Sequence, residues 1–268
     1  DQFSLRAEHV ASRLRERILD SVIPNPIEAG PRAGEWRQEQ IEKQRGEKLF
    51  SRILVSLSGS PHSWQALQQA LVFAQREDAQ ILGLHMVKNK NALSSAATQA
   101  VQEKFNTCCQ DAGNPGELAL DFSEITPTII ERSRWSDLVV VHLAHPPSDN
   151  ILRRLGPGFH RLVQGCPRPI LAVPRAFPRL DKLLLAYDGS AKADEALYVA
   201  VYLAGKWKLP LSVLIVLDGE RFPKRAAARA RWYLSSHKII GDIHFRHGPV
   251  AKTIMQTASR VNRINITG

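Results

Sequence analysis

The chain has 268 residues, 44% of them hydrophobic and 23% charged, which is typical of a soluble globular protein long enough for two domains. No apolar run approaches the roughly 18–20 residues that span a bilayer, and the polar, charged start is unlike a secretory signal. Three cysteines without a Cys-x-x-Cys pair argue against a disulfide framework or a zinc site. We therefore expect a reducing, cytoplasmic environment.

The net charge of +10 is concentrated in two stretches. Residues 151–180 contain six arginines and no acid: Arg153, Arg154, Arg161, Arg168, Arg175 and Arg179. The second stretch contains Arg221, Lys224, Arg225, Arg229 and Arg231. Such patches attract nucleotide phosphates, nucleic acid or anionic membrane surfaces, and they are equally consistent with a solvated basic face. Charge by itself indicates no specific nucleic acid.

Residues 1–48 come first in the chain and are predicted to be a helical arm and linker. Val10, Leu14 and Ile18 mark one side of a helix, which Pro24 ends. We expect this stretch to be an arm and not a domain. The chain starts without Met, so we also expect an upstream portion.

The rest of the chain contains one pattern twice, 130 positions apart. ILVSLSGSPHSWQALQQALVFA at 53–74 and LLLAYDGSAKADEALYVAVYLA at 183–204 each combine an apolar run, a Gly-Ser turn and a helical apolar spacing. We therefore predict a first unit at 49–177 and a second at 178–268.

Both units are predicted to alternate strands and helices. The expected strands are 53–57, 81–87, 118–122, 138–143 and 169–174 in unit 1, and 183–187, 211–217, 242–246 and 264–267 in unit 2. The expected later helices are 96–111 and 126–134, then 221–236 and 248–261. The predicted fold class is α/β, with two Rossmann-like, doubly wound, mostly parallel five-stranded units in tandem. Unit 2 is expected to stop after its fourth strand.

The turn after the first strand of each unit is the place to look for a ligand. In doubly wound sheets, ligands bind beyond the carboxyl ends of the strands, at the switch point between the first and fourth strands. That rule places Asp188 and the loop after 264–267 at one crevice. A carboxylate there can accept hydrogen bonds from a ribose or an amine, or help to hold a metal, and a Gly-rich turn before a helix can bind phosphate. Alternatively, Asp188 only caps the helix that follows.

The order of motifs resembles the universal stress protein family over residues 50–268, as a tandem pair. Unit 1 carries ILVSLSGS, SDLVVVH and GPGFHRLVQGCPRPILAVP, and unit 2 carries LLLAYDGS and HGPVAKTIMQTA. The resemblance implies that an adenine nucleotide, ATP (with Mg²⁺) or AMP, binds beside the acid of the first strand, an apolar residue of the second strand and a Gly-rich loop after the fourth. In unit 2 these residues are Asp188, Gly189, Ser190, Val216 and Gly268.

Unit 1 departs from this pattern. Ser58 replaces the acid, His142 and His145 replace the first two glycines, and Gly156-Pro157 replaces Gly-Ser. Histidine side chains block the close backbone approach that phosphates need. We expect unit 1 not to bind ATP in the usual manner. The two histidines could instead bind a metal or a phosphate.

No acid–base pair or catalytic triad of credible spacing is present, so we expect no enzyme, although weak ATP hydrolysis stays open. The leading hypothesis is a nucleotide-responsive stress or regulatory protein. The resemblance implies that it is a homodimer or an intramolecular pseudo-dimer, whose units pair through strands such as 169–174. The first alternative is a cytosolic regulatory module of a membrane transporter or channel, as a partner or as a fusion. The second alternative is an enzyme of the same fold group, an adenylyl transferase or a flavoprotein.

Overall fold

The computed structural model describes residues 48–143, 157–174, 180–217 and 223–263. The predicted arm before residue 48 and the predicted strand at 264–267 lie outside these ranges. Residues 48–268 cluster as one unit that contains two separate sheets. None of the described helices is both long and apolar enough to cross a membrane.

The first sheet has five parallel strands in the order β3-β2-β1-β4-β5. They are β1 (Arg52–Leu57), β2 (Gln80–Met86), β3 (Gly116–Asp121), β4 (Leu138–His142) and β5 (Ile170–Val173). All five predicted strands of unit 1 are therefore confirmed. The order of strands reverses between β1 and β4, which places the switch point where the sequence predicted it.

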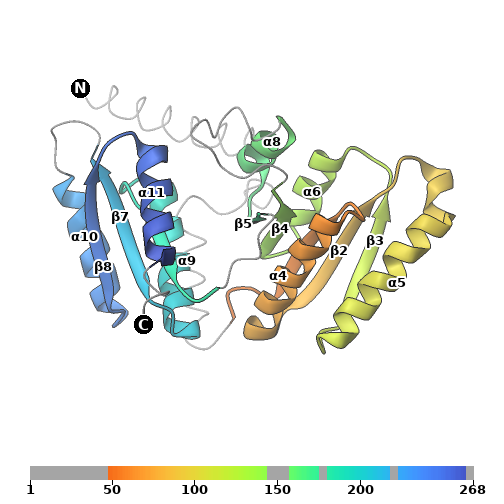
Figure 1. Ribbon diagram of the computed structural model, residues 1–268, viewed down its shortest axis with the longest axis horizontal. Helices are drawn as coiled ribbons and strands as arrows, with labels where there is room; N and C mark the ends of the chain where they lie inside the picture. Colours follow the sequence, from red (N-terminus) through yellow and green to blue (C-terminus); the bar gives the residue numbers. More distant parts are fainter. Residues whose placement is uncertain (1–47, 144–156, 175–179, 218–222, 264–268) are drawn as a thin grey trace, which may run out of the picture. The chain divides into compact units, whose positions relative to one another are not determined.

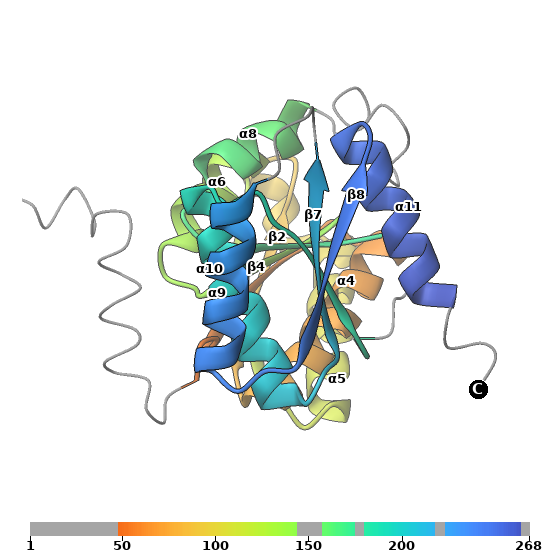
Figure 2. The same cartoon turned by 90° about the vertical axis from the view of Figure 1, so that its left-hand side faces the viewer.

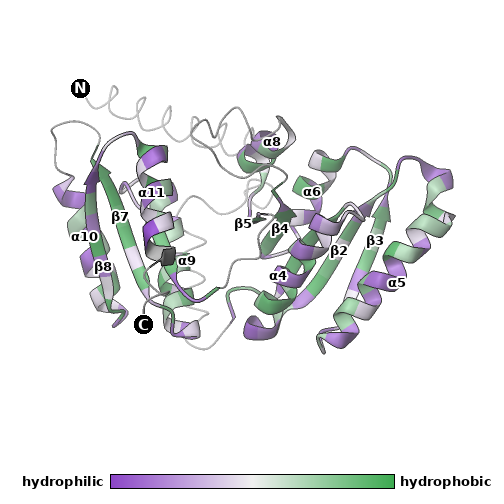
Figure 3. Cartoon of the chain, viewed as in Figure 1, coloured by the Kyte–Doolittle hydropathy of each residue, from purple (hydrophilic) through white to green (hydrophobic). Residues whose placement is uncertain are grey.

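Helices cover both faces of this sheet (Figure 1). Helices α4 (Pro61–Glu77) and α5 (Ala96–Asp111) lie on one face, and α6 (Ile125–Ser133) and α8 (Pro157–Gly165) lie on the other. A short 3-10 helix, η1 (Lys90–Ser94), precedes α5. The central strands are apolar because both of their faces are covered. Figure 3 colours them as hydrophobic, and the side chains of Ile53, Val55 and Val139 are fully buried.

The second sheet has three described strands, all parallel, in the order β6-β7-β8. They are β6 (Leu183–Ala186), β7 (Leu211–Leu217) and β8 (Gly241–His247), and the helices are α9 (Ala191–Trp207), α10 (Lys224–Ser236) and α11 (Val250–Arg263). Figure 2 shows α9 and α10 on one face of this sheet and α11 on the other. The predicted α/β, doubly wound class is confirmed, with one sheet for each predicted unit.

The two repeats share their local chemistry as well as their topology. Helices α4 and α9 begin and end 130 positions apart, and each starts at a serine, Ser60 or Ser190, whose hydroxyl accepts the N–H of the residue three positions on. Each helix ends at a left-handed residue, Asp78 or Lys208, whose N–H returns to the helix. The serine caps satisfy N–H groups that the first helical turn leaves without partners.

Helix α4 also ends in a buried carboxylate that the sequence did not reveal. Glu77 is fully buried, and its oxygens accept hydrogen bonds from three donors of α9. These donors are Tyr202 Oη (2.7 Å), Lys206 Nζ (3.0 Å) and Trp207 Nε1 (2.6 Å). A buried charge is tolerated only when it is paired and hydrogen-bonded. This cluster therefore holds the end of α4 against α9.

Candidate functional site

The turn between β6 and α9 carries three of the predicted site residues. Gly189 has φ +81, a left-handed conformation that glycine adopts without the strain of a side chain. It lets the chain reverse directly into Ser190, the N-cap of α9. Asp188 is exposed at the start of the turn. The sequence therefore places Asp188 at the carboxyl end of β6 and at the N-terminus of a helix, as predicted.

The Asp188 carboxylate takes part in its own turn. Its Oδ1 accepts the backbone N–H of Ser190 at 2.8 Å. This hydrogen bond, followed by one from the Ser190 hydroxyl, lowers the pKa of Asp188 below its ordinary value, so the group is ionised at neutral pH. The exposed carboxylate can accept hydrogen bonds from hydroxyl or amine groups of a ligand, and it can coordinate a metal ion. The alternative that Asp188 only caps the helix is not what the structure shows: the N-cap of α9 is Ser190, and Asp188 instead stabilises the turn before it.

Next to the turn lies a hydrogen-bond chain that runs from a buried tyrosine to an exposed arginine and that sequence reasoning missed. Tyr187 is buried, and its hydroxyl donates to Asp194 Oδ1 of α9 (2.6 Å). Arg229 Nη1 of α10 donates to Asp194 Oδ2 (2.7 Å). Burial, and then the bond to Asp194, raises the pKa of Tyr187, so the phenol keeps its proton. The chain links the residue after β6 to α9 and α10.

Helix α10 also packs tightly against the turn itself. A Cβ added at Gly189 would lie 2.8 Å from the Cβ of Ala226 and 3.4 Å from its Cα. Real side chains do not approach so closely, so the turn admits glycine alone while α10 keeps its place. The turn and α10 are therefore packed against each other, and a displacement of one requires the other to move.

The other two predicted site residues are less informative. Val216 is half-buried in β7, where it pairs in register with Arg246 of β8. Gly268 lies outside the described residues, as does the loop that the resemblance assigns to phosphate. The predicted crevice between the first and fourth strands of unit 2 therefore lacks one side in the described part of the chain.

The first repeat has a different constellation at the same turn. Ser58 Oγ stands in place of the acid and reaches the N–H of Ser60 at 3.4 Å, with Ser60 Oγ at 2.9 Å. A hollow of about 420 Å³ lies between this turn and α5. Its lining includes His85 and Lys104. His85 is buried and donates from Nδ1 to the Leu57 carbonyl at 2.9 Å, which confirms the interpretation of it as a core histidine.

Two histidine rings meet at the switch point of the first repeat. His62, in the first turn of α4, stacks on His142 at the end of β4, with ring centroids 5.0 Å apart and planes inclined by 20°. His62 Nδ1 is buried and has no hydrogen-bond partner among the described residues. The sequence singled out His142 but missed His62, whose position two residues after the N-cap is its only signal. His145, Gly156 and the rest of the loop lie outside the described residues.

No group of three or more His, Cys, Asp or Glu side chains that could hold a metal ion occurs in the described ranges. The three cysteines, Cys108, Cys109 and Cys166, are free thiols. Burial, and then the neighbouring Cys108, raises the pKa of Cys109 to about 11, so Cys109 is not a reactive thiolate at neutral pH.

Comparison with known proteins supports the resemblance. No family model matches the chain. A universal stress protein from Synechocystis sp. (strain ATCC 27184 / PCC 6803 / Kazusa) is 34% identical over 76 residues, 27% of this chain and 25% of that protein. The chain therefore covers only about a quarter of the length of this curated relative.

Solved structures are similar over a longer range. A universal stress protein from Archaeoglobus fulgidus DSM 4304 has a TM-score of 0.65 at 16% identity and covers 80% of this chain and 83% of its own. A functionally unknown protein from Pseudomonas aeruginosa PAO1 has a TM-score of 0.57 at 19% identity, over 80% and 79%. A universal stress protein in complex with cAMP covers 47% of this chain and 98% of its own, with a TM-score of 0.41 at 18% identity. At such identities the first two structures show the fold. The chain is therefore similar in sequence to a universal stress protein over 76 residues, and it has the α/β fold of the first two structures.

Proposed function

We propose that this chain is a non-catalytic, nucleotide-responsive regulatory protein that binds an adenine nucleotide, ATP with Mg²⁺ or AMP, at the β6–α9 turn. The observation that carries the proposal is the placement of Asp188, an exposed and ionised carboxylate between the end of a parallel strand and the N-terminus of α9. A carboxylate at that point can accept hydrogen bonds from a ribose, while the helix N-terminus favours phosphate.

The first repeat has the helix N-terminus but lacks the carboxylate, which favours a single site for each chain. Ser58 offers a neutral hydroxyl, and that hydroxyl is already bonded to Ser60. The stacked rings of His62 and His142 stand at the switch point, where the resemblance expects glycine and phosphate. We infer that the first repeat supports the fold and does not hold ATP in the usual manner.

The packing around the turn supports the proposed regulatory role. Because α10 touches Gly189 through Ala226 and reaches Asp194 through Arg229, a ligand at the turn is coupled mechanically to α10. No observation in the structure favours the transporter-module alternative or the fold-related enzyme alternative, and both stay predictions.

The test is calorimetric titration of the chain with ATP and AMP, with and without Mg²⁺. Asp188→Ala removes the carboxylate and the turn-forming bond together. Asp188→Asn keeps an oxygen that can accept the Ser190 N–H, so it separates the charge from the turn. Ser58→Ala is the matched control in the other repeat. Circular dichroism of each variant checks that the fold is intact.

We expect the affinity to fall at least tenfold in both Asp188 variants and to stay unchanged in Ser58→Ala, because a charge-assisted hydrogen bond is worth about 1.5–3 kcal/mol. Equal losses from both repeats, or no loss from either, would contradict the placement of the site at Asp188.

We further infer a homodimer that forms through β5, as the resemblance implies. Among the described strands, β5 has β4 on one side and none on the other. Val139 N–H bonds to Pro169 O and Leu143 N–H to Val173 O, so alternate residues of β5 face β4 and Ala172 presents its N–H to the open edge. Ala172→Pro should keep the β4 ladder and give a monomer by light scattering. A dimer that persists in this variant would contradict assembly through β5.

A further inference from the structure

Helix α10 has an outer side that the nucleotide proposal does not use. Its inner side packs into the core of the second sheet through Ala226, Ala227, Ala230 and Leu234. The outer side carries exposed Lys224, Arg225 and Arg231. The helix, KRAAARARWYLSS, contains no aspartate or glutamate. The outer side is therefore a cationic surface without acids of its own.

An aromatic ring stands in the middle of this cationic surface. Trp232 is 67% exposed, although tryptophan is one of the residues with most to gain from burial. It lies two positions, or 200°, from both Ala230 and Leu234, and so faces directly away from the core. Arg225, seven positions earlier, lies on nearly the same line of the helix, and Arg231 flanks the ring on one side. We call the outer side formed by Lys224, Arg225, Arg229, Arg231 and Trp232 the α10 surface.

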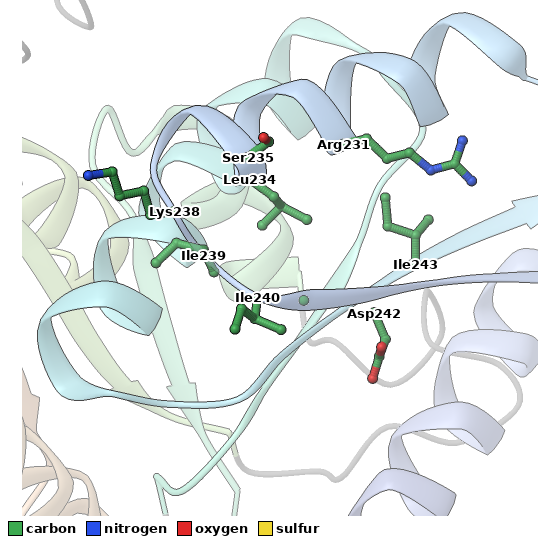
Figure 4. Close-up of a pocket in the computed structure, with 9 residues that line it drawn as sticks. Arg231, Leu234, Ser235, Lys238, Ile239, Ile240, Asp242 and Ile243 are labelled. Atoms are coloured by element: carbon green, nitrogen blue, oxygen red, sulfur yellow. The ribbon is translucent and has the colours of Figure 1, made fainter.

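Most of the charge of the α10 surface is available to a partner. Arg229 is paired with Asp194, whereas Arg225 and Arg231 have no ion pair within the part of the chain that the structure describes. Next to this surface, an open hollow of about 700 Å³ is lined by Arg231 and by Ser235, Lys238, Ile240 and Asp242, among others (Figure 4). Ile240 is 97% exposed there. Lys238 adds another cation, and Asp242 is the one acid in the lining.

An exposed indole beside unpaired cations favours one class of anionic partner over another. An anionic membrane is bound by a helix whose exposed side carries a row of large apolar groups. The α10 surface offers a single ring, and the neighbours one turn away are the small residues Ala228 and Ser236. Single-stranded nucleic acid instead needs cations for the phosphates and a ring on which a base can stack, because every base has an aromatic face.

We propose that the α10 surface binds single-stranded nucleic acid without sequence preference, with a base stacked on Trp232 and phosphates held by Lys224, Arg225 and Arg231. The proposal is independent of the nucleotide site at Asp188, and either can fail without the other. The contact with Ala226 at Gly189 places this surface on the helix that packs against that site.

The test is fluorescence anisotropy of a labelled 12-nucleotide RNA of mixed sequence, titrated with the full chain at 50 and 200 mM salt. Three phosphate contacts to a single strand give a salt slope of about −2, so the affinity should fall about 20-fold between these concentrations. Arg225→Gln combined with Arg231→Gln should lower this slope to about −0.7.

Trp232→Ala should weaken binding about tenfold or more, and Trp232→Phe should recover most of the loss, because a phenyl ring still stacks. The matched control is Trp135→Ala, which removes a tryptophan of the first repeat that is 73% exposed. It should leave binding unchanged. Because both indoles are exposed, neither variant should alter the circular dichroism spectrum.

Two further probes decide between charge and stacking. A 12-base-pair duplex, whose bases are already stacked, should bind more weakly than the single strand. Vesicles of phosphatidylcholine and phosphatidylserine should show no binding that depends on Trp232. The proposal is overturned if the RNA does not bind at 50 mM salt, if Trp232→Ala binds like the unaltered chain, if the duplex binds as tightly as the single strand, or if the vesicles, but not the RNA, bind through Trp232.

Discussion

Replacement of Gly189 by alanine tests how tightly α10 packs against the turn of the candidate site. The left-handed backbone at φ +81 is strained for a residue with a Cβ, by about 1–2 kcal/mol. The new Cβ would also lie 2.8 Å from the Cβ of Ala226, an atom that moves only if α10 moves. Overpacking of this kind costs about 1–3 kcal/mol. Together these terms predict a loss of about 2–5 kcal/mol in the free energy of unfolding.

Two other glycines separate the terms. Gly113 has φ +65 and open space around its missing Cβ, so Gly113→Ala introduces only the backbone strain of about 1–2 kcal/mol. Gly59 has φ +78, and its new Cβ would meet Cγ2 of Val101 at 3.3 Å, a side-chain methyl that can shift slightly. Gly59→Ala should therefore be only slightly more destabilising than Gly113→Ala, and Gly189→Ala distinctly more than either.

The assay is urea unfolding of the three variants, combined with hydrogen exchange followed by mass spectrometry. Exchange in residues 224–236 should speed up in Gly189→Ala alone, because only there must α10 move. If Gly189→Ala is no more destabilising than Gly113→Ala, or if exchange in α10 is unchanged, the tight contact between the turn and α10 is refuted.

Two further predictions concern charged groups outside the site. Glu77→Gln keeps the shape of the buried side chain but turns an amide N–H₂ toward a donor, either Trp207 or the Tyr202–Lys206 pair. We expect this change to lower the free energy of unfolding, measured in urea, by about 2–4 kcal/mol, whereas the control Glu103→Gln at an exposed position should change it by no more than about 0.5 kcal/mol. Equal effects of the two substitutions would show that the Glu77 cluster contributes nothing to stability. The Ser123 hydroxyl and backbone N–H, followed by Arg132, lower the pKa of Asp121 to about 2, so the stability it contributes is present above about pH 4 and is lost as the pH falls toward 2. Between pH 5 and pH 2 the free energy of unfolding of the unaltered chain should therefore fall on the order of 1 kcal/mol more than that of Asp121→Asn, as measured by thermal or urea unfolding. Parallel pH profiles of the two proteins would show that Ser123 and Arg132 do not stabilise the ionised carboxylate.

The repeat explains why so much of the fold could be predicted from sequence. The Gly-Ser turns, the serine caps and the apolar runs are local signals, and each repeat supports the interpretation of the other. Short apolar strands that alternate with helices leave few arrangements other than a doubly wound parallel sheet. The same local signals placed Asp188, Gly189 and Ser190 in one turn at the N-terminus of α9.

The interactions that were missed all depend on tertiary contacts. Glu77, between Arg76 and Asp78, has the sequence context of a solvated helix end, and only the packing of α9 buries it. Asp194 and Arg229 are 35 residues apart and meet only because α10 lies on the same face of the sheet as α9. His62 has no sequence signal beyond its place in the first turn of α4, and its stacking on His142 requires β4 to lie beside β1. Sequence patterns specify which face is buried, but not which polar groups meet there.

The most direct test of nucleotide binding at the second repeat is a native mass spectrum of the purified chain beside that of Asp188→Asn. We predict that the unaltered chain, as purified or after addition of ATP or AMP, carries one adenine nucleotide that is released on denaturation, and that the variant carries none. A nucleotide that stays bound in Asp188→Asn, or a chain that binds neither ATP nor AMP, would contradict the account.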